Sequence, residues 1–145
     1  MLIMNEKMGE CAEDEDNYCL ELVREISAST KLIHDCLVYD KENEIDENKI
    51  NFNKLLEMYG DKTGYEVSCN EIRIEKELIS KSHFFFLVNE LDRELEEKFS
   101  RKVVIYIQEL EDSFDLRFHS LRENEKKWLS ENLDEYDNPI ICHIP

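Results

Sequence analysis

Three side chains near the C-terminal end have the chemistry of metal ligands, or of a nucleophile and its base. They are His119, Cys142 and His143. Imidazole and thiolate groups suit zinc, but a structural zinc site takes four ligands. On a strand, Cys142 shares a face with Ile140 and Ile144, and His143 points to the other face. A small metal-binding protein or enzyme stays open as one interpretation, and an ordinary buried cysteine is the other.

Carboxylate pairs are a second source of chemistry, because two acids can serve as general acid and general base. The sequence contains 35 Asp and Glu residues, so such pairs arise by chance. It contains no glycine-rich phosphate loop, no GxSxG motif and no HExxH motif. We therefore expect a protein that is not an enzyme and that binds no cofactor and no metal.

Charge is the most prominent property of the sequence. The 35 acidic residues face only 18 Lys and Arg residues, which gives a net charge of −17. This balance opposes binding to nucleic-acid phosphates and to anionic membranes. It favours fast capture of a basic protein partner through electrostatic steering, and simple solubility is the competing explanation.

Aromatic residues lie among the acids in the C-terminal third of the chain. Tyrosine and tryptophan often anchor protein interfaces, and surrounding carboxylates set register and association rate. The competing interpretation is that Trp128 and Tyr136 pin a loop to the core. The predicted partner-binding residues are Glu111, Asp112, Asp134, Glu135, Tyr136 and Asp137.

Two adjacent strands are predicted within Lys102–Leu121, where apolar and polar residues alternate on both sides of a short acidic turn. Ile140–Ile144 predicts a third strand of the same antiparallel sheet, and Tyr65–Glu75 indicates a further strand or a ragged hairpin. One face of the sheet is expected to be free. Its outer residues are Tyr106, Gln108, Asp115, Arg117, His119, Ile141 and His143.

Two to three helices are expected to cover the other face. The strongest stripe comprises Phe84, Val88, Leu91, Leu95 and Phe99, preceded by Ser80 or Ser82 as a cap.

Three weaker helical patterns accompany it. Phe52–Tyr59 lies between a capping Asn51 and the stop signal Gly60. An apolar stripe from Cys19 to Leu37, capped at Asp16 or Asn17 behind an acidic run, predicts a helix of about five turns. Apolar residues off the stripe leave two alternatives, a helix buried on more than one side or a break near Ser27–Thr30. Glu125–Glu131 indicates one or two further turns.

These elements together predict an α+β fold in a single domain, residues 1–145, with a small antiparallel sheet covered by helices. The five cysteines are scattered and odd in number, which is typical of reduced, intracellular protein. The N-terminal residues lack a signal-peptide pattern, and no stretch approaches about 20 apolar residues. We expect a cytoplasmic protein.

The segment FHSLRENEKKWLSENLDEYDNPIICHI resembles the C-terminal part of bacterial toxin-immunity proteins of contact-dependent growth inhibition and related polymorphic toxin systems. The likeness lies in Phe118, Arg122, Trp128-Leu129, Leu133, Tyr136 and Pro139. It implies a small acidic cytosolic protein that binds the C-terminal domain of its cognate toxin and blocks it. No contact residue carries over, because immunity contacts differ from family to family.

Three functions therefore stand beside one another. The first is an immunity protein that neutralises a basic, nuclease-type toxin domain by covering its active site or substrate path. The second is an acidic mimic of nucleic acid that inhibits DNA-binding proteins, for which the residues up to 48 have the highest charge density. The third is the metal-binding protein or enzyme that uses His119, Cys142 or His143.

Overall fold

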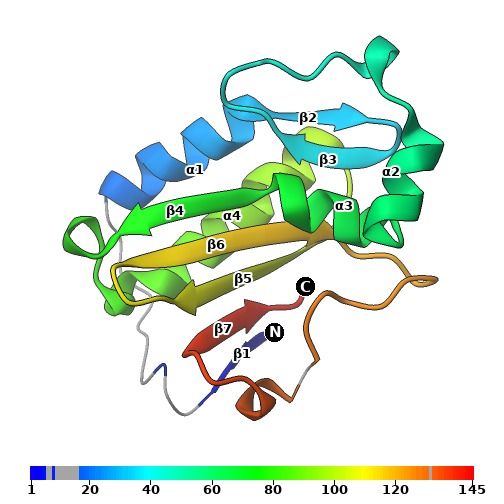
Figure 1. Cartoon of the computed structure of the whole chain (residues 1–145). Coiled ribbons are helices and arrows are strands. Elements are labelled where there is room, and N and C mark those ends of the chain that lie inside the picture. The colour runs from blue at the N-terminus through cyan, green and yellow to red at the C-terminus, as the bar shows by residue number, and fades with distance from the viewer. Residues whose placement is uncertain (6–7, 9–16, 131) are drawn as a thin grey trace.

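The computed structural model describes residues 1–5, 8, 17–130 and 132–145 (Figure 1). Its strands are β1 (Leu2–Met4), β2 (Thr30–Ile33), β3 (Cys36–Tyr39), β4 (Glu71–Glu75), β5 (Val103–Glu109), β6 (Ser113–Ser120) and β7 (Ile140–His143). Its α-helices are α1 (Asn17–Ser29), α2 (Phe52–Tyr59), α3 (Lys62–Cys69) and α4 (Phe84–Phe99). Short 3-10 turns cover Glu47–Lys49, Lys76–Leu78, Lys81–His83 and Leu133–Glu135.

Within the described residues, five strands form one antiparallel sheet in the order β1-β7-β5-β6-β4. β5 pairs with β6 from Val103 opposite Ser120 to Glu109 opposite Phe114, and β7 pairs with the other edge of β5. The predicted hairpin, the final strand and the α+β class are confirmed. β1 was not predicted, because three residues are too few to show an alternation.

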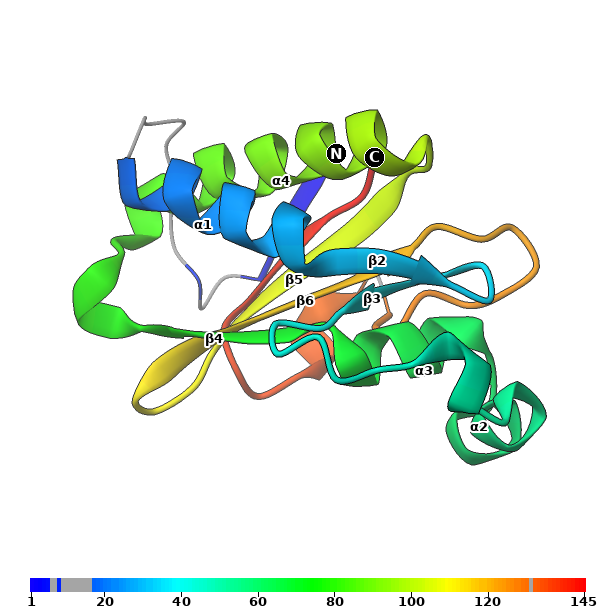
Figure 2. The same ribbon diagram turned by 90° about the horizontal axis from the view of Figure 1, so that it is seen from above.

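Helices α1 and α4 lie side by side on one face of the sheet (Figure 2). The predicted stripe of α4 is confirmed, because Phe84, Val88, Leu91 and Leu95 are fully buried against that face. The hydroxyl of Ser80 accepts a hydrogen bond from the Ser82 N–H and so caps the 3-10 turn that leads into α4.

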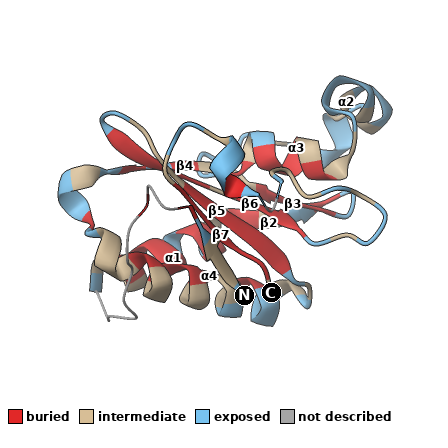
Figure 3. Ribbon diagram, turned by 90° about the horizontal axis from the view of Figure 1, so that it is seen from below, coloured by how far each residue is buried: buried red, intermediate tan, exposed pale blue. Residues whose placement is uncertain are grey.

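The opposite face of the sheet is covered as well, so the expectation of a free face is wrong. Val104, Tyr106 and Cys142 pack there against Trp128 and Leu129 of the segment 121–139. The sequence pattern of β5 alternates, yet its residues from Val103 to Ile107 are all buried (Figure 3). This strand, apolar at five of its seven positions, is thus sandwiched between two layers.

Ile141 and His143 lie on the face opposite to the one expected. Ile141 is paired with Ile107 and joins the core under the helices. His143 points toward α4, where its Nε2 lies 3.0 Å from Oδ2 of Asp92. As predicted, His143 and Cys142 lie on opposite faces of the sheet, but each lies on the face expected for the other.

The predicted helix from Cys19 to Leu37 is only half right. α1 ends at Ser29, and β2 and β3 then form an antiparallel hairpin that pairs Thr30 with Tyr39 and Ile33 with Cys36. Its two turn residues have positive φ, 48° at His34 and 67° at Asp35. This backbone matches the tight turn whose twist suits a two-residue hairpin.

α2 is confirmed at its predicted bounds, with the Asn51 side chain accepting from Lys54 N–H and Gly60 at φ 89°. The strand expected from Tyr65 is wrong up to Cys69, because these residues belong to α3. Only Glu71–Glu75 forms a strand. Gly64 permits the close approach of α2 and α3, since a Cβ there would lie 2.4 Å from the Tyr59 carbonyl oxygen.

The remaining expectations concern the chain ends. The segment expected as helix at Glu125–Glu131 is irregular in its described part, and a 3-10 turn follows at Leu133–Glu135. The acidic run before Asn17, with Asp16 as a possible cap, lies outside the described residues. None of the helices that the structure describes is long and apolar enough to cross a membrane.

Candidate functional site

Five of the six predicted partner-binding residues are exposed. Glu111 and Asp112 form the tip of the turn between β5 and β6, and the other three belong to the segment 121–139. The Glu109 N–H donates to the Pro139 carbonyl at 2.8 Å, so this turn and the approach to β7 meet at one end of the sheet. We call these exposed acids the acidic rim: Glu111, Asp112, Asp134, Glu135 and Asp137.

The sixth residue, Tyr136, is half-buried and belongs to the cluster that holds the segment 121–139 on the sheet. Its hydroxyl oxygen accepts a hydrogen bond from the Ser130 N–H at 2.9 Å. Trp128 meets Tyr106 edge-on with ring centroids 5.3 Å apart, and the Arg117 guanidinium lies 5.1 Å from the Trp128 ring. Both aromatic residues thus hold in place the segment that contributes Asp134, Glu135 and Asp137 to the acidic rim.

His119 packs against Tyr106 on the same face of the sheet. Its Nδ1 lies 2.8 Å from the Ser120 carbonyl oxygen and donates to it, so Nε2 accepts from the Tyr106 hydroxyl at 3.1 Å. Burial lowers the pKa of His119 and raises that of Tyr106. His119 is therefore a neutral hydrogen-bonding residue of the core.

The three residues considered for metal chemistry do not converge. His119 and Cys142 lie on the face covered by the segment 121–139, and His143 lies on the helix face. Within the described part of the chain, no group of three or more His, Cys, Asp and Glu residues is placed to hold a metal ion.

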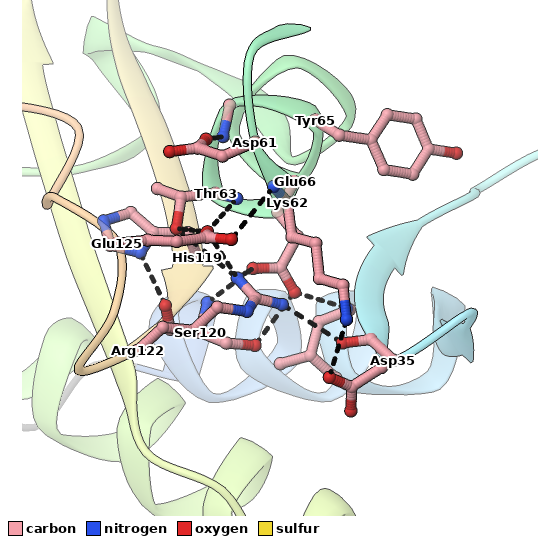
Figure 4. Close-up of polar contacts among 12 residues, drawn as sticks. Asp35, Asp61, Lys62, Thr63, Tyr65, Glu66, His119, Ser120, Arg122 and Glu125 are labelled. Atoms are coloured by element: carbon pink, nitrogen blue, oxygen red, sulfur yellow. Dashed lines mark hydrogen bonds and ion pairs between the residues drawn. The ribbon is translucent and has the colours of Figure 1, made fainter. Parts of the chain in front are cut away.

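The densest polar contacts of the described structure lie where α3 crosses between β3 and β6 (Figure 4). Sequence reasoning did not identify this junction cluster, which comprises Asp35, Lys62, Glu66, Arg101, Ser120, Arg122 and Glu125. Glu66 has no exposed surface. It accepts from the N–H groups of Leu37 and Ser120, from the Ser120 hydroxyl at 2.8 Å and from Arg122 at 2.6 Å.

Asp35 and Glu125 close the two sides of this cluster. The Asp35 carboxylate accepts from Arg101 at 2.8 Å and from Lys62 at 3.3 Å, and the bond from Arg101 lowers its pKa. Glu125 accepts from the N–H of Thr63 at 2.9 Å and from its hydroxyl at 2.7 Å. Burial alone would raise the pKa of Glu125, but these bonds lower it.

Two polar cavities of about 260 and 340 Å³ open beside the junction cluster, and Asp35 and Arg122 line both. The groups around them are already engaged, since Glu66 accepts four hydrogen bonds and the Ser120 hydroxyl donates to it. The nearby Cys36 is fully buried, and burial raises the pKa of its thiol to about 12. We assign the cluster a structural role, the attachment of the β2–β3 hairpin.

One sequence signal could have revealed this junction. Glu66 and Asn70 are four residues apart and fall among Tyr65, Val67 and Cys69, so a helical interpretation places two polar side chains on one face. The apparent alternation at these positions favoured a strand instead.

The acidic stretch considered for mimicry of nucleic acid is only partly described. Its densest run, Glu13–Asp16, lies outside the described residues, and its remainder folds into α1, the β2–β3 hairpin and the loop that follows. The described acids of this stretch include the exposed Glu21 and Glu25 of α1 and the exposed Glu42 and Glu44 of the loop, while α1 and the hairpin bury one face each in the core.

Comparison with known proteins gives one family. The sequence model of the Uncharacterized protein PM0498 family matches residues 3–144, and the chain belongs to this family. No curated protein and no solved structure matches the chain.

Proposed function

We propose that this chain is an immunity-type inhibitor that binds a basic, nuclease-type toxin domain and blocks its active site or substrate path. The acidic rim, together with Tyr136, forms the contact surface. Recognition is by complementary charge, and the chain performs no chemistry of its own.

The observation that carries this proposal is that most basic side chains are paired with acids of the chain itself, which leaves many acids in surplus. Within the described residues, twelve of the chain's 18 Lys and Arg side chains form ion pairs with the chain's own acids. They are Lys31, Lys41, Lys49, Lys62, Arg73, Lys76, Lys81, Arg93, Arg101, Lys102, Arg117 and Arg122. The surplus carboxylates produce a field that attracts cations over about a Debye length, roughly 8 Å at physiological salt.

The rim also has a defined shape. The segment 121–139 is fixed by the Trp128 and Tyr136 contacts, and the β5–β6 turn is fixed by the sheet. Carboxylates on such fixed supports lose little freedom on binding, which favours affinity as well as rate.

The first experiment uses the gene next to the one for this chain. The C-terminal domain of its product is expressed alone and together with this chain. We expect that domain to stop growth alone, to be harmless in the pair and to co-purify with this chain. The association rate should fall about tenfold or more as NaCl rises from about 0.02 M to about 0.5 M. A rate that is unchanged by salt contradicts recognition by charge.

Two charge-matched triple variants then test the rim. Both remove three negative charges, so they change the net charge equally. The rim variant is Asp134→Asn, Glu135→Gln and Asp137→Asn. The control is Glu47→Gln, Glu57→Gln and Glu97→Gln, three exposed acids on other elements. The rim variant should slow association several-fold more than the control, and equal rates would place the contact elsewhere.

The number of different proteins that the chain inhibits distinguishes this function from mimicry of nucleic acid. An immunity-type inhibitor should protect against one toxin domain, whereas a mimic should displace DNA from several unrelated DNA-binding proteins. Inhibition of several such proteins at similar concentrations would replace the proposal by the mimic.

A further inference from the structure

One margin of the sheet ends at β4. Among the described residues, β4 pairs only with β6, and no strand pairs with its outer edge. β3 lies beyond the end of β4 and is joined to β6 by the Asn70 and Glu66 side chains, while β2 lies on the outer side of β3. Among the described strands, none continues the row of β2 beside β4.

The register shows which backbone groups of β4 face outward. On β6, the Phe118 carbonyl and the Ser120 N–H are turned toward α3, on the β4 side. Residues alternate along a strand, so Phe114 and Leu116 point their backbone groups at β4. They are opposite Ile74 and Ile72, which bond back to β6. The N–H and C=O groups of Glu71, Arg73 and Glu75 consequently face away from the sheet.

A cavity of about 360 Å³ lies beside these outward groups. Tyr18 and Leu22 of α1 line it from the helix layer, and Tyr39 and Lys41 line it at the end of β3. Glu71, Ile72 and Arg73 form its floor. An extended segment in this place would meet backbone partners on one side and aromatic and aliphatic side chains above.

The charges that line the cavity are balanced, with Glu25 and Glu71 paired to Lys41 and Arg73, and the acidic excess lies in the residues around it. Residues 21–25, 41–44 and 71–77 together contain seven acidic and four basic residues. A segment of the opposite charge would therefore be favoured, and a second copy of the same acidic edge would be repelled.

We propose that the outer edge of β4 receives an extended basic segment of the partner protein, which adds to the sheet as a further strand. This inference rests on the proposed function for the identity of the partner. Main-chain hydrogen bonds to Glu71, Arg73 and Glu75 supply affinity, and the cavity under α1 receives alternate side chains.

The deciding variant is Arg73→Pro, with Arg73→Ala as its matched control. Proline removes the outward N–H without breaking the ladder to β6, as it does on edge strands in general. Binding of the toxin domain should weaken at least about tenfold in Arg73→Pro and less than about threefold in Arg73→Ala. Equal affinities of the two variants overturn the inference and leave the proposed function standing.

Amide hydrogen exchange gives a second readout on the unaltered chain. The amides of Glu71, Arg73 and Glu75 should become protected in the complex, and their continued fast exchange counts against strand addition. Glu75→Pro, which also removes an outward N–H, replaces Arg73→Pro if that variant has a lower melting temperature.

If the toxin domain does not bind at all and the proposed function fails, binding of a short peptide still tests strand addition at the outer edge of β4. The probe is a blocked hexapeptide of alternating lysine and valine, and its control alternates glutamate and valine. Only the lysine peptide should shift the amide resonances of Glu71, Arg73 and Glu75, and Arg73→Pro should abolish the shifts. Absence of these shifts, or a dimer of the chain that Arg73→Pro dissociates, overturns the inference.

Discussion

At the scale of single residues, Glu66 is the most constrained acid of the described chain. It is completely buried, and it joins α3 to two segments that are far apart in sequence: β3 at Leu37, and the end of β6 at Ser120 with Arg122 just beyond it. A buried ion pair gains little over apolar packing, but removal of one partner leaves an uncompensated charge. The fold therefore depends on this carboxylate more than on any acid of the rim.

Replacement of Glu66 by alanine should lower the free energy of unfolding by about 3–5 kcal/mol. The reason is that the Arg122 guanidinium and the N–H groups of Leu37 and Ser120 lose their acceptor inside the protein. Urea denaturation measures the change, and Glu57→Ala on the exposed surface of α2 should change it by less than about 0.5 kcal/mol. A loss below about 1 kcal/mol would show that water replaces the carboxylate.

The sequence predicted residues of the surface better than residues of the interior. Glu111, Asp112 and Asp137 are exposed because turns and strand approaches lie outside any core. Glu66 and His119 were not recognised as buried hydrogen-bonding residues. Ser120, a partner of Glu66, is 54 residues away in the sequence, and Tyr106, a partner of His119, is 13 residues away. Spacing along a chain contains no record of such contacts.

At the scale of elements, the β2–β3 hairpin is attached to the main sheet by side chains instead of a strand ladder. The Asn70 amide donates to the carbonyls of Leu37 at 2.9 Å and Phe118 at 3.1 Å, and its oxygen accepts from the Tyr39 N–H at 2.7 Å. One asparagine side chain thus links β3 to β6 where the two strands form no ladder.

Replacement of Asn70 by alanine should loosen this hairpin selectively. Amides of Thr30–Tyr39 should exchange with solvent at least about tenfold faster, because local opening no longer breaks the Asn70 bonds. Amides of β5 should keep their protection. Hydrogen exchange measured by NMR reports the protection of the hairpin and of β5. The control is Ser68→Ala, an exposed position of α3, the helix that Asn70 caps. Equal acceleration in β5 would mean that hairpin and sheet open as one unit.

Elements with strong local periodicity were predictable, and those set by distant contacts were not. Phe84–Phe99 and Val103–Glu109 have a repeat long enough to determine their type. Thr30, Ile33 and Leu37 fit the spacing of a helix equally well. The turn at His34 and Asp35 and the bonds from this stretch to Asn70 and Glu66 accompany its folding as a hairpin. Strand pairing of this kind is decided by tertiary contacts.

At the scale of the whole molecule, the fold has to hold a net charge of −17 together. The ion pairs at Lys62, Arg101 and Arg122 attract locally, whereas the surplus carboxylates repel one another over longer distances. Salt screens the long-range repulsion more than the short, half-buried pairs.

Added salt should therefore stabilise the protein. An increase from about 0.02 M to about 0.2 M NaCl should raise the melting temperature by about 2–4 °C, the equivalent of about 1 kcal/mol for a chain of this size. The variant Glu47→Gln, Glu57→Gln and Glu97→Gln should show a smaller rise. A melting temperature that falls with salt would mean that the ion pairs outweigh the repulsion.

The position of β5 between β6 and β7 has a consequence for the order of folding. β6 follows β5 at once, but β7 begins only at Ile140, some thirty residues after β5 ends. A chain that has formed the β5–β6 hairpin before β7 docks has one edge of Val103–Ile107 unpaired, which is a template for association with another such chain. The surplus of carboxylates opposes that association by mutual repulsion until β7 closes the edge.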